Sequence, residues 1–170
     1  MSFSFLPTLR CESLTEVTAS FLRSRGIRLL MLDFDNTIVP YVTSTPTPEM
    51  DAWLRHMLDT DIRVCVVSNS RRDRVKVFCR QYGMPCITHS RKPFPKGIRQ
   101  CLAQFGVRPE ESAIAGDQIF TDTLGGNCAR LTTILVKPIN NHNFWLKARH
   151  VLEQPFILMA KNRRLQYEKS

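Results

Sequence analysis

Long apolar runs are missing from this sequence of 170 residues, in which 43% of the residues are hydrophobic and 23% are charged. The longest runs are short, for example residues 156–160, whereas a membrane-spanning helix needs about 20 apolar residues. The N-terminus also lacks the basic start and the long apolar stretch of a secretory signal. We therefore expect a cytoplasmic protein that does not cross a bilayer, and the length favours one domain over residues 1–170.

Paired cysteines and clustered histidines are missing as well. None of the six cysteines forms a C-x-x-C pair, several lie among apolar neighbours, and the four histidines are scattered along the chain. These patterns argue against a zinc site. We interpret the cysteines as reduced thiols in the core of a cytoplasmic protein.

The chain also has few acidic residues. Its 15 Asp and Glu are outnumbered by 24 Lys and Arg, which gives a net charge of +9. A surplus this large favours an anionic partner such as nucleic acid, anionic lipid or a phosphorylated substrate. Residues 31–70 are the exception, with six acidic and two basic side chains. An acidic segment inside a basic protein indicates a cation site.

Patterns typical of strands and helices alternate about five times along the chain. Nearly continuous apolar runs are typical of strands buried on both faces, and apolar residues at helical spacing are typical of helices that cover a sheet. The strand-like runs are residues 27–32, 62–67, 86–88, 113–115 and 133–136. The helical patterns are residues 14–21, 50–58, 75–82 and 98–105.

This alternation predicts an α/β fold, a doubly wound parallel sheet with its core in residues 27–136. A Ser13-x-x-Glu16 capping box predicts an N-terminal helix over residues 13–25, and a helical tail is expected over residues 139–165. In such a sheet, ligands bind at the carboxyl ends of the strands. The residues that follow the predicted strands are therefore the candidates for a functional site.

Two carboxylates, Asp33 and Asp35, follow the first predicted strand. Residues two apart on an extended segment point the same way, so a cation or a shared proton has to offset their repulsion, and Mg²⁺ prefers such oxygen ligands. The chemistry allows a division of labour in which Asp33 attacks phosphorus while Asp35 protonates the leaving oxygen and then deprotonates water. The alternative is a pair of surface aspartates in a turn.

Polar residues follow three further strands. Ser68 stands where a helix begins, beside backbone N–H groups that can clamp a phosphate, and an ordinary helix N-cap is the alternative. Lys92 precedes a Pro-x-Pro turn that can hold it toward a phosphoryl group, and a solvated lysine is the alternative. Gly116 allows a tight turn, Asp117 is placed to complete a metal site and Asp122 to support Lys92 or the loop. The alternative for this last motif is an N-cap aspartate.

The order of these motifs, D-x-D-x-T, S, K-P and G-D-x-x-x-x-D, resembles that of the haloacid dehalogenase (HAD) superfamily of phosphohydrolases. The resemblance implies a HAD-like Rossmannoid fold and an aspartyl-phosphate at Asp33, with Asp35 as the acid/base. It also implies that the Asp33 carboxylate, the Asp35 backbone carbonyl and Asp117 bind Mg²⁺. The remaining motif residues divide into the phosphate-binding Ser68, Asn69 and Lys92 and the supporting Thr37, Gly116 and Asp122.

Room for a cap domain, the insertion with which HAD enzymes select substrates, is missing too. Only 34 residues separate Asp33 from Ser68, and 23 separate Ser68 from Lys92. A flap at residues 37–47 and one helix fill the first gap, and one helix and one strand fill the second. We therefore expect an open site, which suits a phosphate carried on a protein, a nucleic acid or a lipid head group.

The residues within the motifs indicate a particular subfamily of the HAD superfamily. Residues 32–40, 68–70, 92–97 and 116–122 are together similar to the YqeG-type phosphatases of HAD subfamily IIIA, which are related to eukaryotic phosphatidylglycerophosphate phosphatases. This resemblance implies a Mg²⁺-dependent phosphomonoesterase that converts phosphatidylglycerophosphate to phosphatidylglycerol in phospholipid biosynthesis.

Two basic and aromatic segments, residues 139–152 and 155–164, fit a lipid substrate. Such segments can lie in an anionic membrane interface, so peripheral contact with the inner face of a membrane is expected. The alternative is a terminal helix that packs its apolar side on the sheet and turns its charges to solvent.

Two other functions stay open. A capless HAD phosphatase can also act on a nucleic-acid, protein or small-molecule phosphate, although the interleaved aromatic platform of single-strand binders is not evident. A non-catalytic HAD-fold binding module is the other alternative, and the intact set of motif residues argues against it. No obligate protein partner is evident from the sequence.

Overall fold

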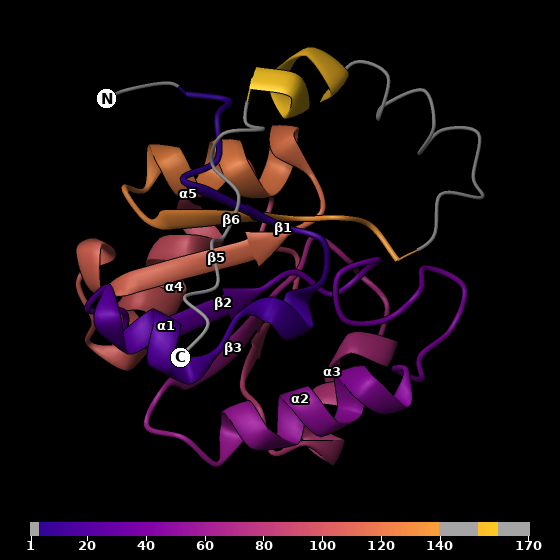
Figure 1. Cartoon of the computed structure of the whole chain (residues 1–170). Coiled ribbons are helices and arrows are strands. Elements are labelled where there is room, and N and C mark those ends of the chain that lie inside the picture. The colour runs from indigo at the N-terminus through magenta and orange to yellow at the C-terminus, as the bar shows by residue number, and fades with distance from the viewer. Residues whose placement is uncertain (1–3, 140–152, 160–170) are drawn as a thin grey trace.

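Six parallel strands form one sheet in the computed structural model, which describes residues 4–139 and 153–159 (Figure 1). The order across the sheet is β1-β6-β5-β2-β3-β4, and every pair of neighbours is parallel. The predicted α/β fold with a parallel sheet is confirmed. The strands are β1 (Leu9–Cys11), β2 (Leu29–Leu32), β3 (Arg63–Val67), β4 (Cys86–Ile87), β5 (Ser112–Gly116) and β6 (Thr132–Val136).

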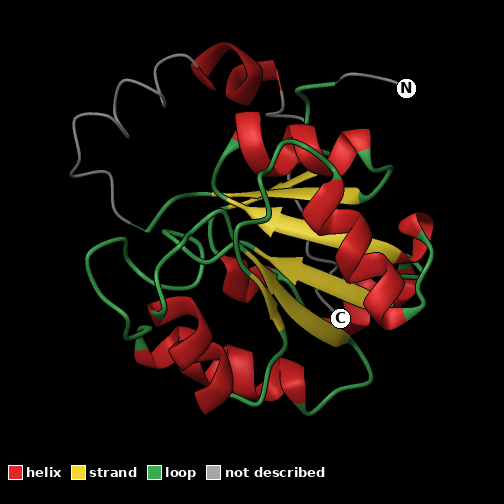
Figure 2. Cartoon of the chain, turned by 180° about the vertical axis from the view of Figure 1, so that it is seen from behind, coloured by secondary structure: helices red, strands yellow, loops and turns green. Residues whose placement is uncertain are grey.

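Helices cover both faces of this sheet, as Figure 2 shows. Consecutive side chains of a strand point to opposite faces, and in β2 Leu30 and Leu32 belong to one hydrophobic cluster while Leu29 and Met31 belong to another. All four are fully buried, which explains the continuous apolar run of this strand. The first cluster includes side chains of α1 (Ala19–Ser24), α2 (Pro48–Leu58) and α3 (Arg74–Gln81), and the second includes those of α4 (Lys96–Phe105).

The prediction of a single helix over residues 13–25 is wrong. The Ser13 capping box is present, but it caps only a 3-10 turn, η1 (Leu14–Glu16). The chain is extended at Val17, which is fully buried and whose carbonyl accepts a hydrogen bond of 2.8 Å from the indole of Trp53. Packing of Val17 into the core therefore overrides the local helix signal, and α1 begins only after this break.

The edge strand β1 is not predicted by the sequence pattern. It has only three residues, too few to show the periodicity of a strand. Leu9 pairs with Ile134 and Cys11 with Val136 of β6. Pairing with β6, a neighbour in the sheet that lies more than 100 residues further along the chain, therefore defines this strand, and its own residues do not.

The connections between the strands leave no cap domain within residues 4–139. The chain passes from β2 through the flap and α2 to β3, and only α3 lies between β3 and β4. Between β5 and β6, the π-helix η3 (Ile119–Thr123) runs directly into α5 (Leu124–Cys128). Within the described residues, no inserted domain therefore covers the carboxyl edge of the sheet, as the motif spacing predicts.

The C-terminal helical tail is described only in part. Residues 153–159 are helical, and Phe156 packs against Phe5 and Phe120, with ring centroids 5.0 and 6.1 Å apart. Leu158 and Met159 of the same segment are exposed. The rest of the predicted tail and all of its basic residues lie outside the described residues. In the described part of the chain, every helix is too short or too polar to cross a membrane.

The six cysteines are all unoxidised thiols, as predicted, and four of them are buried. Burial raises the pKa of the Cys11 thiol to about 12, so this side chain stays protonated at neutral pH. The four buried cysteines therefore serve the packing of the core, whereas Cys86 and Cys128 are only partly buried.

Candidate active site

The carboxyl ends of three neighbouring strands bring predicted motif residues together. Asp33 follows β2, while Ser68 and Asp117 follow β3 and β5, the two neighbours of β2 in the sheet. The backbone N–H of Asp33 donates to the Ala115 carbonyl, and that of Ser68 donates to the Ile87 carbonyl, both at 2.9 Å. The pairing of the strands therefore continues into the site and fixes the backbone from which these side chains start.

Lys92 connects two of the predicted carboxylates. Its Nζ lies 2.7 Å from Oδ1 of Asp33 and 2.7 Å from Oδ1 of Asp122, and its side chain is buried. Burial disfavours the charged lysine, but the carboxylates of Asp122 and Asp33 outweigh this effect and raise the pKa of Lys92. Burial raises the pKa of Asp122, against the attraction of Lys92. The alternative of a solvated surface lysine is wrong.

Gly116 allows Asp122 to approach the end of β5. A Cβ atom on Gly116 would overlap the carboxyl group of Asp122. The Asp122 carboxylate also accepts a hydrogen bond of 3.2 Å from the backbone N–H of Gln118. Gly116 is not among the residues with a positive φ, so the glycine is needed for this close approach and not for the tight turn that the sequence suggests.

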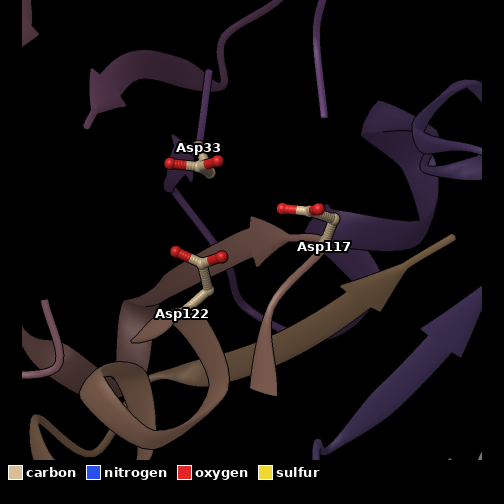
Figure 3. Close-up of side chains that lie close together, drawn as sticks. All are labelled: Asp33, Asp117 and Asp122. Atoms are coloured by element: carbon tan, nitrogen blue, oxygen red, sulfur yellow. The ribbon is translucent and has the colours of Figure 1, made fainter. Parts of the chain in front are cut away.

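The carboxylates of Asp33, Asp117 and Asp122 point toward a common space (Figure 3). One oxygen atom of each lies within 4.8 Å of the others, and all three residues are buried. Together with the ammonium group of Lys92, they leave two negative charges, which a divalent cation would neutralise. An all-oxygen donor set fits Mg²⁺. The third acid in this group is Asp122 and not Asp35, whose predicted contribution is a backbone carbonyl.

The side chain of Asp35 forms an ion pair with Nη2 of Arg74, in the first turn of α3. Nη1 of Arg74 donates to the Thr43 carbonyl of the flap at 2.5 Å. The guanidinium carbon lies 5.2 Å from the ring centroid of Phe34 and 5.9 Å from that of Tyr41. Burial lowers the pKa of Arg74, but an arginine stays charged at neutral pH. Arg74 therefore holds the predicted acid/base in place relative to the flap.

Arg74 contacts the site, and none of the sequence motifs includes it. A basic residue in the first turn of a helix is repelled by the positive end of the helix dipole, and the first turn of α3 contains no acidic residue. The arginine thus needs a carboxylate from elsewhere in the fold. This unfavourable placement is the sequence signal that marks it.

Ser68 and Asn69 begin the loop that follows β3. Oγ of Ser68 accepts the backbone N–H of Ser70 at 3.0 Å, which leaves the hydroxyl hydrogen for a phosphoryl oxygen. The amide of Asn69 accepts from the Lys92 N–H at 2.7 Å and from Oγ of Ser90 at 2.8 Å, and it donates to the Lys92 carbonyl at 2.9 Å. Asn69 thus positions the loop that carries Lys92, and its direct contact with phosphate stays a prediction.

The flap begins with a turn beside Asp35. Asn36 has a left-handed φ of 61°, which asparagine tolerates, and its Oδ1 accepts the Tyr41 N–H at 3.1 Å. Thr37 is buried, and its Oγ1 has no hydrogen-bond partner among the described residues. The turn therefore directs the flap toward the site, and the supporting role of Thr37 stays a prediction.

A cavity of about 420 Å³ lies at the carboxyl edge of the sheet. Asp33, Ser68 and Lys92 form its buried floor, and the exposed residues at its rim include Tyr41 from the flap. The cavity is large enough for a phosphorylated head group, and its charged floor suits a phosphate.

Glu153 is a second residue that sequence reasoning misses. It is buried, and its Oε1 accepts the backbone N–H groups of Ile119 at 3.0 Å and of Phe120 at 3.4 Å. These are the first two residues of η3, where a helix leaves donors without partners, and η3 carries Asp122. Glu153 lies in the tail, outside the alternation of strands and helices. A single glutamate there forms no sequence pattern from which its contact with η3 could be predicted.

Comparison with known proteins agrees with this geometry. Residues 38–130 match the family described as haloacid dehalogenase-like hydrolase, and the chain belongs to this family. The class is therefore a HAD-type phosphatase. Over 135 residues the chain is 34% identical to the Bacillus subtilis (strain 168) protein named Probable phosphatase YqeG, and the match covers 79% of this chain and 78% of that protein.

Solved structures show the same fold at low identity. The 3-deoxy-D-manno-octulosonate 8-phosphate phosphatase of Yersinia pestis matches with a TM-score of 0.55 and 17% identity, over 86% of this chain and 89% of that chain. The cobalt-bound phosphatase YrbI of Haemophilus influenzae matches with a TM-score of 0.53 and 15% identity, over 74% of this chain and 75% of that chain. These likenesses confirm the HAD-like Rossmannoid fold.

Proposed function

We propose that this protein is a Mg²⁺-dependent phosphomonoesterase that hydrolyses phosphatidylglycerophosphate through an aspartyl-phosphate at Asp33. The position of Asp33 is the observation that carries the proposal. Its carboxylate lies on the floor of the cavity, 2.7 Å from Nζ of Lys92, and Ser68 and Asp35 line the same cavity. A nucleophile, a cation, a hydroxyl donor and an acid therefore surround one space of substrate size.

The reaction has two balanced steps. In the first, which starts from the protonated form of Asp35, a carboxylate oxygen of Asp33 attacks phosphorus, the P–O bond to the alcohol breaks, and Asp35 donates its proton to the leaving oxygen. In the second, Asp35 accepts a proton from water, the water oxygen attacks phosphorus, and the P–O bond to Asp33 breaks. Inorganic phosphate leaves, and both carboxyl groups return to their starting states. Lys92 and Ser68 bind the phosphoryl oxygens in both steps.

A Mg²⁺ ion held by Asp33 and Asp117 would supply positive charge that screens the phosphoryl group from the nucleophile. The group of three buried carboxylates supports this assignment. We expect chelation of divalent metal to stop phosphate release and Mg²⁺ to restore it. We also expect Mg²⁺ to raise the melting temperature of the wild type but not of Asp117→Asn. Full activity after chelation would contradict the metal requirement.

Three features support a lipid substrate. The site edge carries no cap within residues 4–139, the net charge is +9, and the helical segment at residues 153–159 exposes Leu158 and Met159. Glu153 ties this segment to η3, which carries Asp122. In our proposal, the segment contacts the inner face of an anionic membrane peripherally, where the lipid head group enters the open site.

The test of the substrate is phosphate release from phosphatidylglycerophosphate in mixed micelles, measured against a 5′-phosphorylated oligonucleotide at equal phosphate concentration. We expect kcat/KM to be at least about tenfold higher for the lipid. Asp33→Asn, prepared in parallel, is expected to release no phosphate from either substrate. Wild-type activity in Asp33→Asn would contradict the aspartyl-phosphate mechanism.

The remaining outcomes favour the alternatives. A preference for the oligonucleotide would favour a nucleic-acid phosphate as the substrate. Complete inactivity toward a generic aryl phosphate with Mg²⁺ present would favour a non-catalytic binding module.

A further inference from the structure

Two arginines at the rim of the cavity take no part in the proposed chemistry. Arg71 and Arg72 line the same cavity as Asp33, and both side chains are exposed. Within residues 4–139 and 153–159, neither forms an ion pair with a carboxylate. Arg74, in contrast, is paired with Asp35. Two positive charges at the opening of the site are therefore ready to bind an anion.

The loop that presents these arginines is the one that carries the phosphate-binding serine. Oγ of Ser68 accepts the backbone N–H of Ser70 at 3.0 Å, and Oγ of Ser70 accepts that of Arg72 at 3.2 Å. Two successive hydrogen bonds thus link Arg72 to Ser68. An anchored backbone lowers the entropy that is lost when the side chains bind a ligand.

The ring of Tyr41 places Arg72 on the side of the cavity where Asp35 lies. The guanidinium carbon of Arg72 is 5.6 Å from the ring centroid, and that of Arg74, the partner of Asp35, is 5.9 Å from it. Asp35 is the proposed acid for the leaving alcohol, so the alcohol part of the substrate lies on this side. Arg72 therefore lies on the side of the alcohol, and Arg71, its neighbour in the chain, lines the same cavity, whereas the floor of the cavity holds the phosphoryl group that is transferred.

We propose that Arg71 and Arg72 form a second anion subsite, which binds a negatively charged group on the alcohol part of the substrate. This inference rests on the proposed phosphatase mechanism. Guanidinium groups pair bidentately with phosphate oxygens, so the substrate class is a phosphomonoester whose alcohol carries a phosphodiester or a second phosphate. Phosphatidylglycerophosphate meets this requirement, because one glycerol unit joins its monoester to a phosphodiester. Glycerol 3-phosphate does not, because its alcohol is neutral.

The experiment compares two soluble substrates that differ in this second charge. One is glycerophosphoglycerophosphate, the deacylated head group, and the other is glycerol 3-phosphate. For the wild type we expect kcat/KM to be at least about tenfold higher for the head group, the effect of one charge-assisted hydrogen bond. In Arg71→Gln/Arg72→Gln we expect this ratio to fall below about twofold, chiefly through a higher KM for the head group.

A matched control removes the same charge from the helix that follows this loop, at positions outside the cavity. Lys76→Gln/Arg80→Gln replaces two exposed basic residues of α3 that do not line the cavity, and it is expected to keep the wild-type ratio. Three results would overturn the subsite. They are a wild-type ratio near one, a ratio that Arg71→Gln/Arg72→Gln leaves intact, and an equal fall in the control.

The soluble substrates also separate this inference from the lipid proposal. In one outcome, the kcat/KM ratio of head group to glycerol 3-phosphate depends on the two arginines, but lipid in mixed micelles is not preferred over the oligonucleotide. The subsite then stands and the proposal of a lipid substrate fails. If the lipid is hydrolysed well and the ratio does not depend on the arginines, the subsite fails and the lipid substrate stands. A 5′-phosphorylated dinucleotide, whose alcohol also carries a phosphodiester, is the third arm. If kcat/KM is higher for the dinucleotide than for the head group and this preference depends on the two arginines, the subsite stands and its anion belongs to a nucleic acid.

Discussion

The floor and the rim of the cavity use charge in opposite ways. On the floor, Lys92 and Asp122 are 5% and 2% exposed, and the ammonium group of Lys92 also bonds Asp33. At the rim, Arg71 and Arg72 are exposed and have no carboxylate partner among the described residues. A charge removed from water has to be paired because its desolvation is costly, whereas an exposed charge can stay unpaired. The floor therefore consists of charges that the fold pairs with one another, whereas the rim presents charges to solvent, where our proposal places the selection of the substrate.

Removal of the central charge of the floor is expected to have the largest effect. Lys92→Met leaves the carboxylates of Asp33 and Asp122 without their shared cation, which costs about 3–5 kcal/mol of unfolding free energy when a buried pair is broken. We also expect phosphate release to fall at least about a hundredfold. Urea denaturation and a phosphate-release assay check both effects. Lys96→Met, at an exposed lysine of α4, is the control and is expected to change stability by less than about 0.5 kcal/mol.

Crowding of the floor is the next strongest disturbance. In Gly116→Ala, the new methyl group overlaps the carboxyl group of Asp122, so Asp122 has to move away from Lys92. Overpacking of this kind costs about 1–3 kcal/mol, and we expect kcat to fall about tenfold. Gly106→Ala is the control because its Cβ meets open space at a positive φ of 60°, so it strains only the backbone. A variant Gly116→Ala with normal kcat would show that the position of Asp122 is not critical.

Arg74 joins the floor to the rim and is expected to have an intermediate effect. Arg74→Leu removes the partner of Asp35, and we expect kcat to fall about tenfold while KM changes little, because the acid/base loses its orientation. Arg74→Lys, which keeps the positive charge, is expected to recover part of kcat. Equal loss of kcat in Arg74→Lys and Arg74→Leu would mean that packing of the guanidinium on Phe34 and Tyr41 matters and the charge does not.

The smallest effect is expected at the rim itself. Tyr41→Ala removes an exposed ring that lies against Arg72, so we expect KM for the head group to rise about threefold and the unfolding free energy to change by less than about 0.5 kcal/mol. Steady-state kinetics and urea denaturation check both. If Tyr41→Ala lowered the unfolding free energy as much as Lys92→Met, the proposed difference between the floor and the rim would be wrong.

Much of the fold is predictable because its signals are local. The apolar run that contains β2 is continuous because both faces of the sheet are covered, and Asp33 and Asp35 directly follow it. The same holds for Ser68 after β3 and Asp117 after β5. Parallel strands bring their carboxyl ends to one edge, so a motif that follows each strand predicts a shared site. The Lys92–Asp122 contact, which the order of motifs suggests, is also present in the structure.

The failures arise where a contact between distant segments overrides a local signal. The Ser13 capping box is present, yet burial of Val17 ends the helix after one turn. The strand β1 has only three residues and is defined by its pairing with β6. Arg74 lies on a helix and pairs with Asp35, and Glu153 lies in the tail and binds η3. The local sequence around each of them gives no indication of these partners.

The sequence by itself determined the class of the fold and the identity of the acids on the floor, because periodicity and residue order are properties of neighbouring residues. Only the tertiary structure decided that Asp122 joins Asp33 and Asp117 in one group of carboxylates. It also decided that Arg74 pairs with Asp35 and that two arginines without a carboxylate partner among the described residues line the cavity. These contacts join residues far apart in the chain, and their energies depend on distance and burial, which exist only once the sheet and its helices are packed.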